Sequence, residues 1–86
     1  MNYDAFRVEL GKLGFDNEWY HLPCMRTELP QMMVSWVANP IGVQLQIKNE
    51  KGLFEQQRVE YIDMYNATLR QIEFNIEKFT QKQKEK

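Results

Sequence analysis

The sequence has few of the residues that build cross-links and metal sites. Cys24 is the only cysteine and His21 is the only histidine. A single cysteine excludes an intramolecular disulfide, and a structural zinc site needs about four Cys or His ligands. The stretch YHLPC also offers no third group that would orient a Cys–His nucleophile pair. We therefore expect neither a metal site nor a catalytic thiol.

Glycine-rich phosphate loops and long apolar runs are missing as well. The four glycines are scattered, and none belongs to a nucleotide-binding motif. The amino terminus MNYDAFRVEL carries acidic residues where a secretory signal would be basic. Apolar runs fall short of the roughly 20 residues that span a bilayer. These absences predict a cytoplasmic, non-enzymatic protein without a cofactor and without a membrane partner.

Positive charge is scarce in the body of the chain. The net charge is −1, from 11 Lys and Arg against 12 Asp and Glu. Three of the lysines and one glutamate lie in residues 80–86, which leaves 8 basic and 11 acidic residues in 1–79. Nucleic-acid binders generally present a basic face that neutralises phosphates. The acidic body therefore argues against nucleic acid as the partner.

The chain has enough apolar matter for one small domain. Hydrophobic residues make up 43% and aromatics 13% of 86 residues, which argues against intrinsic disorder. We place this domain at 1–79. The remaining TQKQKEK, residues 80–86, has no apolar residue and is predicted to fray.

Two helices and a small set of strands follow from the hydrophobic spacing. Apolar residues at steps of three and four in YDAFRVELGKLGF predict a first helix that Gly14 ends. QMMVSWVA and the strictly alternating GVQLQIK predict two strands, and Trp19–Leu22 is a candidate for a short extended piece before Pro23. LFEQQRV is either a third strand or the opening of the last helix. The turn signal in NEKG favours a strand.

A long helix is expected from about Glu60 to Gln81. Its apolar residues form one stripe at steps of three and four: Ile62, Tyr65, Leu69, Ile72, Ile76 and Phe79. The predicted fold is α+β, an antiparallel sheet of about three strands with both helices packed on one face. The stripe is then core in the first place. The same spacing also fits a short dimer seam, so a homodimeric structural or adaptor protein is an alternative.

The order of helix, strands and helix resembles that of the double-stranded-RNA-binding domain. That family grips phosphates with lysines at the start of its last helix. Here the corresponding stretch RVEYIDMYN carries Arg58 against Glu60 and Asp63. The resemblance covers element order alone, and a nucleic-acid-binding module is an alternative function.

Apolar side chains beyond the needs of the core favour binding to another protein. Phe74 lies around the last helix from the stripe, with Tyr61 and Met64 as weaker members of the same patch, and the loop adds Trp19 and Tyr20. These five residues are the predicted binding residues. By size and charge the chain is similar to small phage or mobile-element inhibitors of host enzymes and defence complexes. The sequence therefore predicts a protein-binding regulator.

Overall fold

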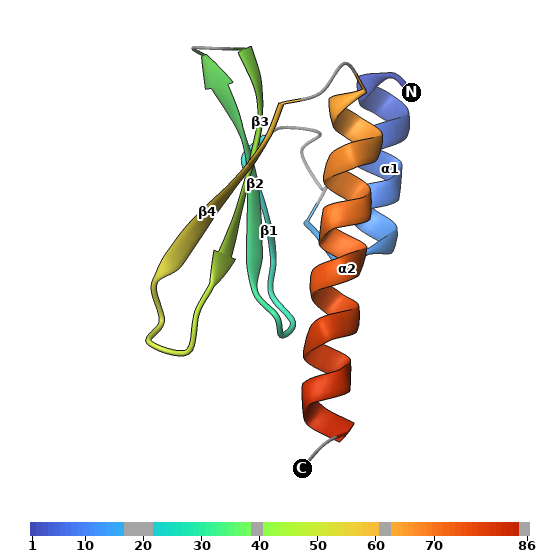
Figure 1. Cartoon of the computed structure of the whole chain (residues 1–86). Helices are drawn as coiled ribbons and strands as arrows, with labels where there is room; N and C mark the ends of the chain where they lie inside the picture. The colour runs from blue at the N-terminus through green and yellow to red at the C-terminus, as the bar shows by residue number, and fades with distance from the viewer. Residues whose placement is uncertain (17–21, 39–40, 61–62, 85–86) are drawn as a thin grey trace.

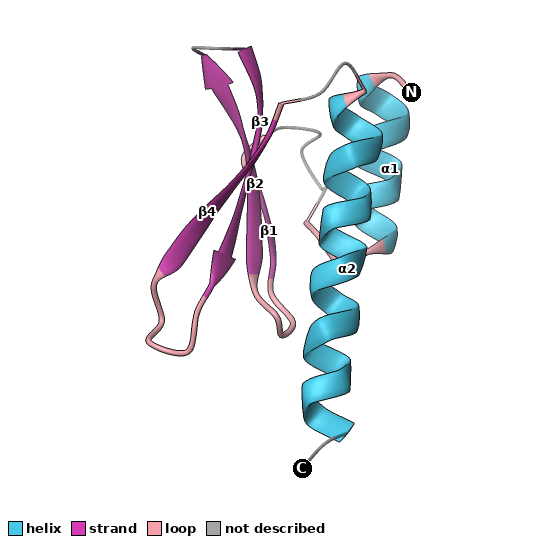
Figure 2. Cartoon of the chain, viewed as in Figure 1, coloured by secondary structure: helices cyan, strands magenta, loops and turns pink. Residues whose placement is uncertain are grey.

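The computed structural model describes residues 1–16, 22–38, 41–60 and 63–84. Within them the chain forms α1 (Tyr3–Lys12), β1 (Cys24–Arg26), β2 (Met32–Ala38), β3 (Ile41–Lys48), β4 (Phe54–Val59) and α2 (Met64–Lys84). The strands form one antiparallel sheet in the order β1-β2-β3-β4. Both helices lie on the same face of the sheet (Figure 1, Figure 2). This confirms the predicted α+β architecture.

The first helix begins and ends at its sequence signals. The Asn2 side chain accepts a hydrogen bond from the Ala5 amide at 2.9 Å, which satisfies one of the free N–H groups of the first turn. Gly14 follows the helix with a φ of 91°, a left-handed conformation that favours glycine. Phe6 and Leu10 are fully buried in the core. The predicted apolar spacing of this helix therefore marks its buried face.

Alternation along β3 separates a buried face of the sheet from an outer face. Val43 and Leu45 are 1% and 0% exposed, whereas Gln44 and Gln46 between and beyond them are half-buried. Leu45 lies opposite Val34 of β2. Opposite residues of an antiparallel pair point to the same face, so the two strands present one apolar layer to the helices.

The segment that the sequence left between strand and helix is a strand. Phe54–Val59 forms β4 and pairs along its whole length with β3. Gly52 has a φ of 83° and its amide donates to the Asn49 carbonyl at 3.0 Å, which closes the turn between these strands. The turn residues in NEKG were thus the decisive signal, and the last helix starts later than Glu60.

The sheet has four strands, one more than the three that the sequence predicted. The additional strand, β1, lies further along the chain than the extended piece that was predicted before Pro23. The expected extended piece was Trp19–Leu22, of which only Leu22 lies within the described residues, in a bend. The strand is β1, which starts directly after Pro23 and pairs with β2. Proline has no N–H group for a strand ladder, so pairing begins at the residue that follows it.

The last helix, α2, begins at Met64, directly after Asp63, and continues into the Lys/Gln-rich tail. The Asp63 carboxylate accepts hydrogen bonds from the backbone and side-chain nitrogens of Asn66, at 3.4 and 2.6 Å. Residues 80–84 of the segment predicted to fray are helical, and Lys82 and Lys84 lie where positive charge interacts favourably with the helix dipole. Neither helix in the described part of the chain combines the length and apolar composition that crossing a membrane requires.

The middle of the apolar stripe of α2 belongs to the core. Leu69 and Ile72 are 8% and 0% exposed, and the half-buried Tyr65 and Ile76 pack against them and their neighbours. Ile62 lies outside the described residues. The stripe therefore first serves the fold of a single chain. A dimer seam along it stays a prediction.

Aromatic rings of the helices and of the sheet pack against one another at the end where both helices begin (Figure 1). The rings of Phe6 and Tyr65 stack at 4.6 Å between centroids, and Tyr3 stacks on Trp36 of β2 at 5.8 Å. Trp36 also meets Tyr65 edge-on at 6.3 Å. These contacts give Trp36 a packing role, although 45% of it is exposed.

Candidate binding groove

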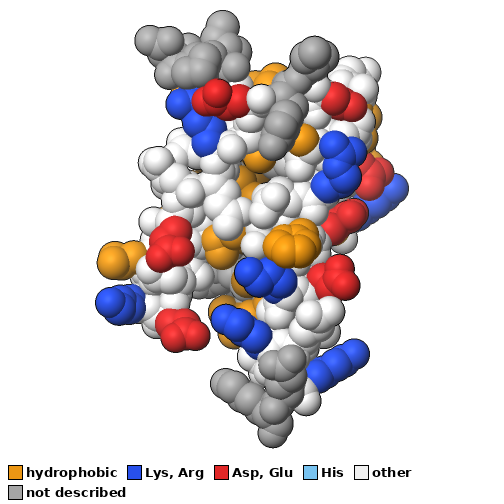
Figure 3. Space-filling view, viewed as in Figure 1, with side chains coloured by type: hydrophobic (Ala, Val, Ile, Leu, Met, Phe, Trp, Pro, Cys, Tyr) orange, Lys and Arg blue, Asp and Glu red, His pale blue; other side chains and the backbone are white. Residues whose placement is uncertain are grey.

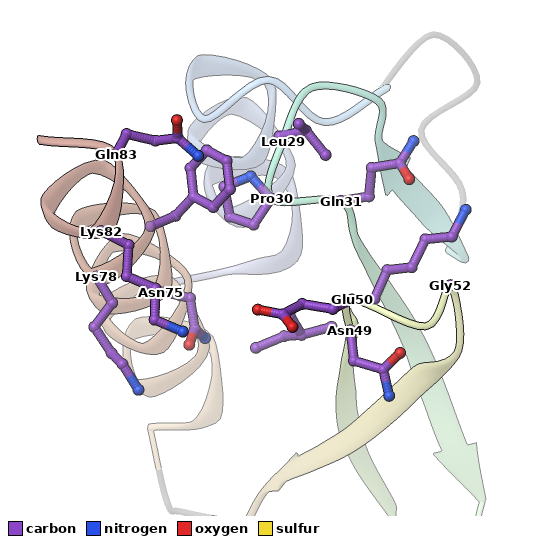
Figure 4. A pocket seen from close by; sticks show the side chains of 13 residues that line it. Leu29, Pro30, Gln31, Asn49, Glu50, Gly52, Asn75, Lys78, Lys82 and Gln83 are labelled. Carbon is purple, nitrogen blue, oxygen red and sulfur yellow. The ribbon is translucent and has the colours of Figure 1, made fainter. Parts of the chain in front are cut away.

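An open groove lies between the C-terminal half of α2, the β1–β2 loop and the β3–β4 hairpin. Figure 4 shows side chains from all three segments converging on it. Its volume is about 1030 Å³. Its lining residues fall within 29–31, 47–52 and 75–83, and we call it the α2 groove.

One side chain holds the β1–β2 loop wall of the groove. Arg26 is 8% exposed, and its Nη1 donates to the carbonyl oxygens of Glu28 and Pro30 at 3.0 Å each. Its Nε donates to the carbonyl oxygen of Leu13, just after α1, at 2.8 Å. A rigid, planar guanidinium can make such a set of bonds at once. The loop and the end of α1 are therefore tied to the same residue of β1.

The hairpin wall is organised by Asn49. Its Oδ1 accepts hydrogen bonds from the amides of Lys51 and Leu53 at 2.9 and 3.0 Å, and its Nδ2 donates to Glu55 at 3.0 Å. A side chain that satisfies several backbone groups of one loop limits the conformations open to that loop. This wall, too, is held by hydrogen bonds within the chain.

The α2 wall is hydrogen-bonded to the neighbouring strand. Gln57 of β4 accepts from the side-chain nitrogens of Gln71 and Asn75, at 3.0 and 3.3 Å. Asn75 also donates to the Gln71 carbonyl at 2.9 Å. Because all three walls are held by hydrogen bonds, a ligand in the groove would order little of the protein on binding.

Apolar side chains contribute to every wall of the groove. Leu29 and Pro30 come from the β1–β2 loop, Ile47 from β3 and Phe79 from α2. Leu29 is 66% exposed, while Ile47 and Phe79 are half-buried. The groove thus offers apolar surface in a concave setting, the usual character of a binding site.

Charged side chains face one another across the groove. Glu50 on the hairpin and Lys82 on α2 project into it from opposite walls, with Lys78 at the helical rim (Figure 4). Lys48 also lines the groove, but its ammonium group lies 6.0 Å from the centroid of the Phe54 ring, which draws it toward the hairpin.

A stripe of exposed residues runs along α2 and ends at this groove. It consists of Arg70, Phe74, Lys78 and Lys82, which follow one another at four-residue spacing and so share one side of the helix. Phe74 is 53% exposed, and Nζ of Lys78 lies 5.5 Å from its ring centroid. Figure 3 shows basic side chains beside an exposed hydrophobic group on this part of the molecule. We call these four residues the Phe74 stripe.

The predicted binding residues are only partly brought together. Phe74 is exposed next to the groove, whereas Met64 is half-buried and packs against the core. Trp19, Tyr20 and Tyr61 lie outside the described residues.

The sequence did not predict that the β1–β2 loop forms a wall of the groove, and it predicted Phe79 as the last residue of the apolar stripe that begins at Ile62. The signal for Leu29 was an apolar residue beside a proline in a charged loop, RTELP. Such a residue has no core periodicity to explain it.

The single thiol is placed as a core residue. Cys24 is 4% exposed, and burial raises its pKa above the ordinary value, although the neighbouring Arg7 guanidinium opposes the shift. A buried, protonated thiol is a poor nucleophile and metal ligand. His21 lies outside the described residues, and the described part of the chain holds no group of three or more His, Cys, Asp or Glu residues that could bind a metal.

Comparisons of this chain with protein-family models, with curated proteins and with solved structures found no match.

Proposed function

We propose that this protein is a small non-enzymatic regulator that binds another protein through the α2 groove and the adjoining Phe74 stripe. The observation that carries the proposal is the groove itself, which combines exposed apolar side chains with walls fixed by Arg26, Asn49 and Gln57. Exposed apolar groups on a rigid concave surface lose little entropy when a partner covers them.

Two exposed apolar residues give the proposal its energetic basis. Leu29 and Phe74 are 66% and 53% exposed, so neither contributes much to the core of the single chain. Full burial of a fully exposed large apolar side chain gains about 1.5–3 kcal/mol, and Leu29 and Phe74 retain more than half of that exposure. Full coverage of these two residues would therefore supply a useful share of the binding free energy of a regulator.

Affinity purification from the native host with a matched set of variants tests the proposal. Leu29→Ser and Phe74→Ala remove the two exposed apolar groups, and Leu53→Ser is the control because Leu53 is 64% exposed but does not line the groove. Each lysate is divided into nuclease-treated and untreated halves, and retained proteins are identified by mass spectrometry. Circular dichroism checks that every variant is folded.

The proposal predicts that the wild type and Leu53→Ser retain one particular protein in both halves. The amount of that protein retained by Leu29→Ser and by Phe74→Ala should be lower by about tenfold or more. Retention by all variants alike would show that the groove is not the binding site. Partners that appear only without nuclease would identify nucleic acid as the ligand and contradict the proposal.

A further inference from the structure

We propose that the partner enters the α2 groove with an acidic segment that carries an apolar side chain. This inference rests on the proposed function and adds the chemistry of the bound segment. It is argued from the charges around the groove, the placement of its apolar groups and the contrast with the rest of the surface.

The charge of the groove is opposite to that of the body of the protein. Among its lining residues Lys48, Lys78 and Lys82 are basic and Glu50 is acidic, and Arg70 extends the positive charge along α2. Residues 1–79 as a whole carry 8 basic and 11 acidic groups. A local positive surface on an otherwise acidic protein attracts negatively charged segments of a partner.

The apolar groups lie within reach of these charges. On α2, Phe79 directly follows Lys78 and lies about one turn before Lys82, while Leu29 and Ile47 line the other two walls. A bound segment could therefore place an apolar side chain between the walls while its carboxylates meet the helical lysines. Glu50 on the hairpin then fixes the direction of the segment, because a carboxylate beside it would be repelled.

The same features favour a peptide over a nucleic acid. Glu50 projects into the groove (Figure 4), where it would repel a phosphate backbone that carries a charge at every residue. Leu29, Ile47 and Phe79 offer apolar surface that phosphates would leave unused. A peptide that is both acidic and apolar can use the lysines of α2 together with the apolar side chains of all three walls.

Fluorescence anisotropy with designed probes tests this chemistry directly. The first probe is a labelled dodecapeptide in which glutamates surround a central Leu-Phe pair. Two matched peptides carry lysine in place of every glutamate or Ser-Ser in place of Leu-Phe, and a single-stranded DNA dodecamer represents nucleic acid. The protein variants are Lys78→Glu/Lys82→Glu and the control Lys12→Glu/Lys51→Glu, which changes the net charge equally at exposed sites that do not line the groove.

We expect the Glu/Leu-Phe peptide to bind more tightly than either matched peptide and than the DNA. Its affinity should fall by about tenfold or more in the groove variant and by less than about threefold in the control variant, and it should weaken as salt is added. Preference for the lysine peptide, equal loss in both variants or no binding by any peptide would overturn the inference.

The two proposals fail separately. If the acidic peptide does not bind but the host protein is still lost by Leu29→Ser, the groove binds a protein of other chemistry and the proposed function stands. If the DNA binds most tightly and the host partners need nucleic acid, both proposals are wrong.

Discussion

Among single side chains, Arg26 makes the hydrogen bonds that hold the β1–β2 loop wall of the groove. It is nearly buried and donates to the carbonyl oxygens of Leu13, Glu28 and Pro30. Arg26→Met keeps much of the apolar bulk but leaves these acceptors without their donor. We therefore expect the free energy of unfolding, measured in urea, to fall by about 2–4 kcal/mol. Arg70→Met, on exposed α2 surface, should change stability by less than about 0.5 kcal/mol. Equal effects in the two variants would contradict the role of Arg26.

Cys24 links stability to pH at the alkaline end. Burial raises the pKa of the folded thiol above its ordinary value of 9.0. The unfolded thiol therefore loses its proton first as the pH rises, so its contribution to stability is complete below about pH 8 and declines above it. Between about pH 8 and pH 10 the wild type should lose more stability than Cys24→Ala, whose side chain does not titrate. Urea unfolding at each pH measures this, and parallel curves would contradict it.

Among the helices and strands, the hairpin of β3 and β4 depends on one turn residue. Asn49 accepts hydrogen bonds from the Lys51 and Leu53 amides and donates to Glu55. Asn49→Ala should cost about 1–2 kcal/mol of stability and speed amide hydrogen exchange at Leu53, because the turn loses its internal acceptor. Gln56→Ala, exposed on the same hairpin, is the control. Unchanged exchange at Leu53 in the Asn49 variant would show that the loop holds its shape by other means.

How far the sequence predicts this fold differs between its elements. The alternation in GVQLQIK and the spacing in α2 follow from burial, so β3 and the core stripe of Leu69 and Ile72 could be predicted. The strand β1 could not, because three residues are too few to show a period and its pairing is set by β2. The groove was missed for a similar reason. Its walls come from three distant segments, and the hydrogen bonds of Arg26 that shape one of them leave no pattern in the sequence.

For the protein as a whole, the position of the stripe determines how copies of the chain can pair. Leu69 and Ile72 are buried within one chain, so a coiled-coil dimer along the stripe would have to displace the sheet from α2. We therefore expect a monomer of 10.4 kDa in light scattering on a sizing column, at concentrations on the order of 50 µM. A dimer at that concentration would show that another surface, or a rearranged α2, joins two copies.

A substitution in the apolar stripe of α2 distinguishes a core role from a dimer contact more sharply than a measurement of molecular mass does. If Leu69 is core, Leu69→Ala leaves a cavity under α2 and should lower the free energy of unfolding by about 2–5 kcal/mol at every protein concentration. If Leu69 instead holds a dimer together, the loss should depend on concentration, because assembly and folding are then linked. Glu73→Ala, exposed on the same helix, is the control and should change neither stability nor mass. Urea unfolding of the Leu69 variant at two concentrations about a hundredfold apart distinguishes the cases, and we expect superimposable curves.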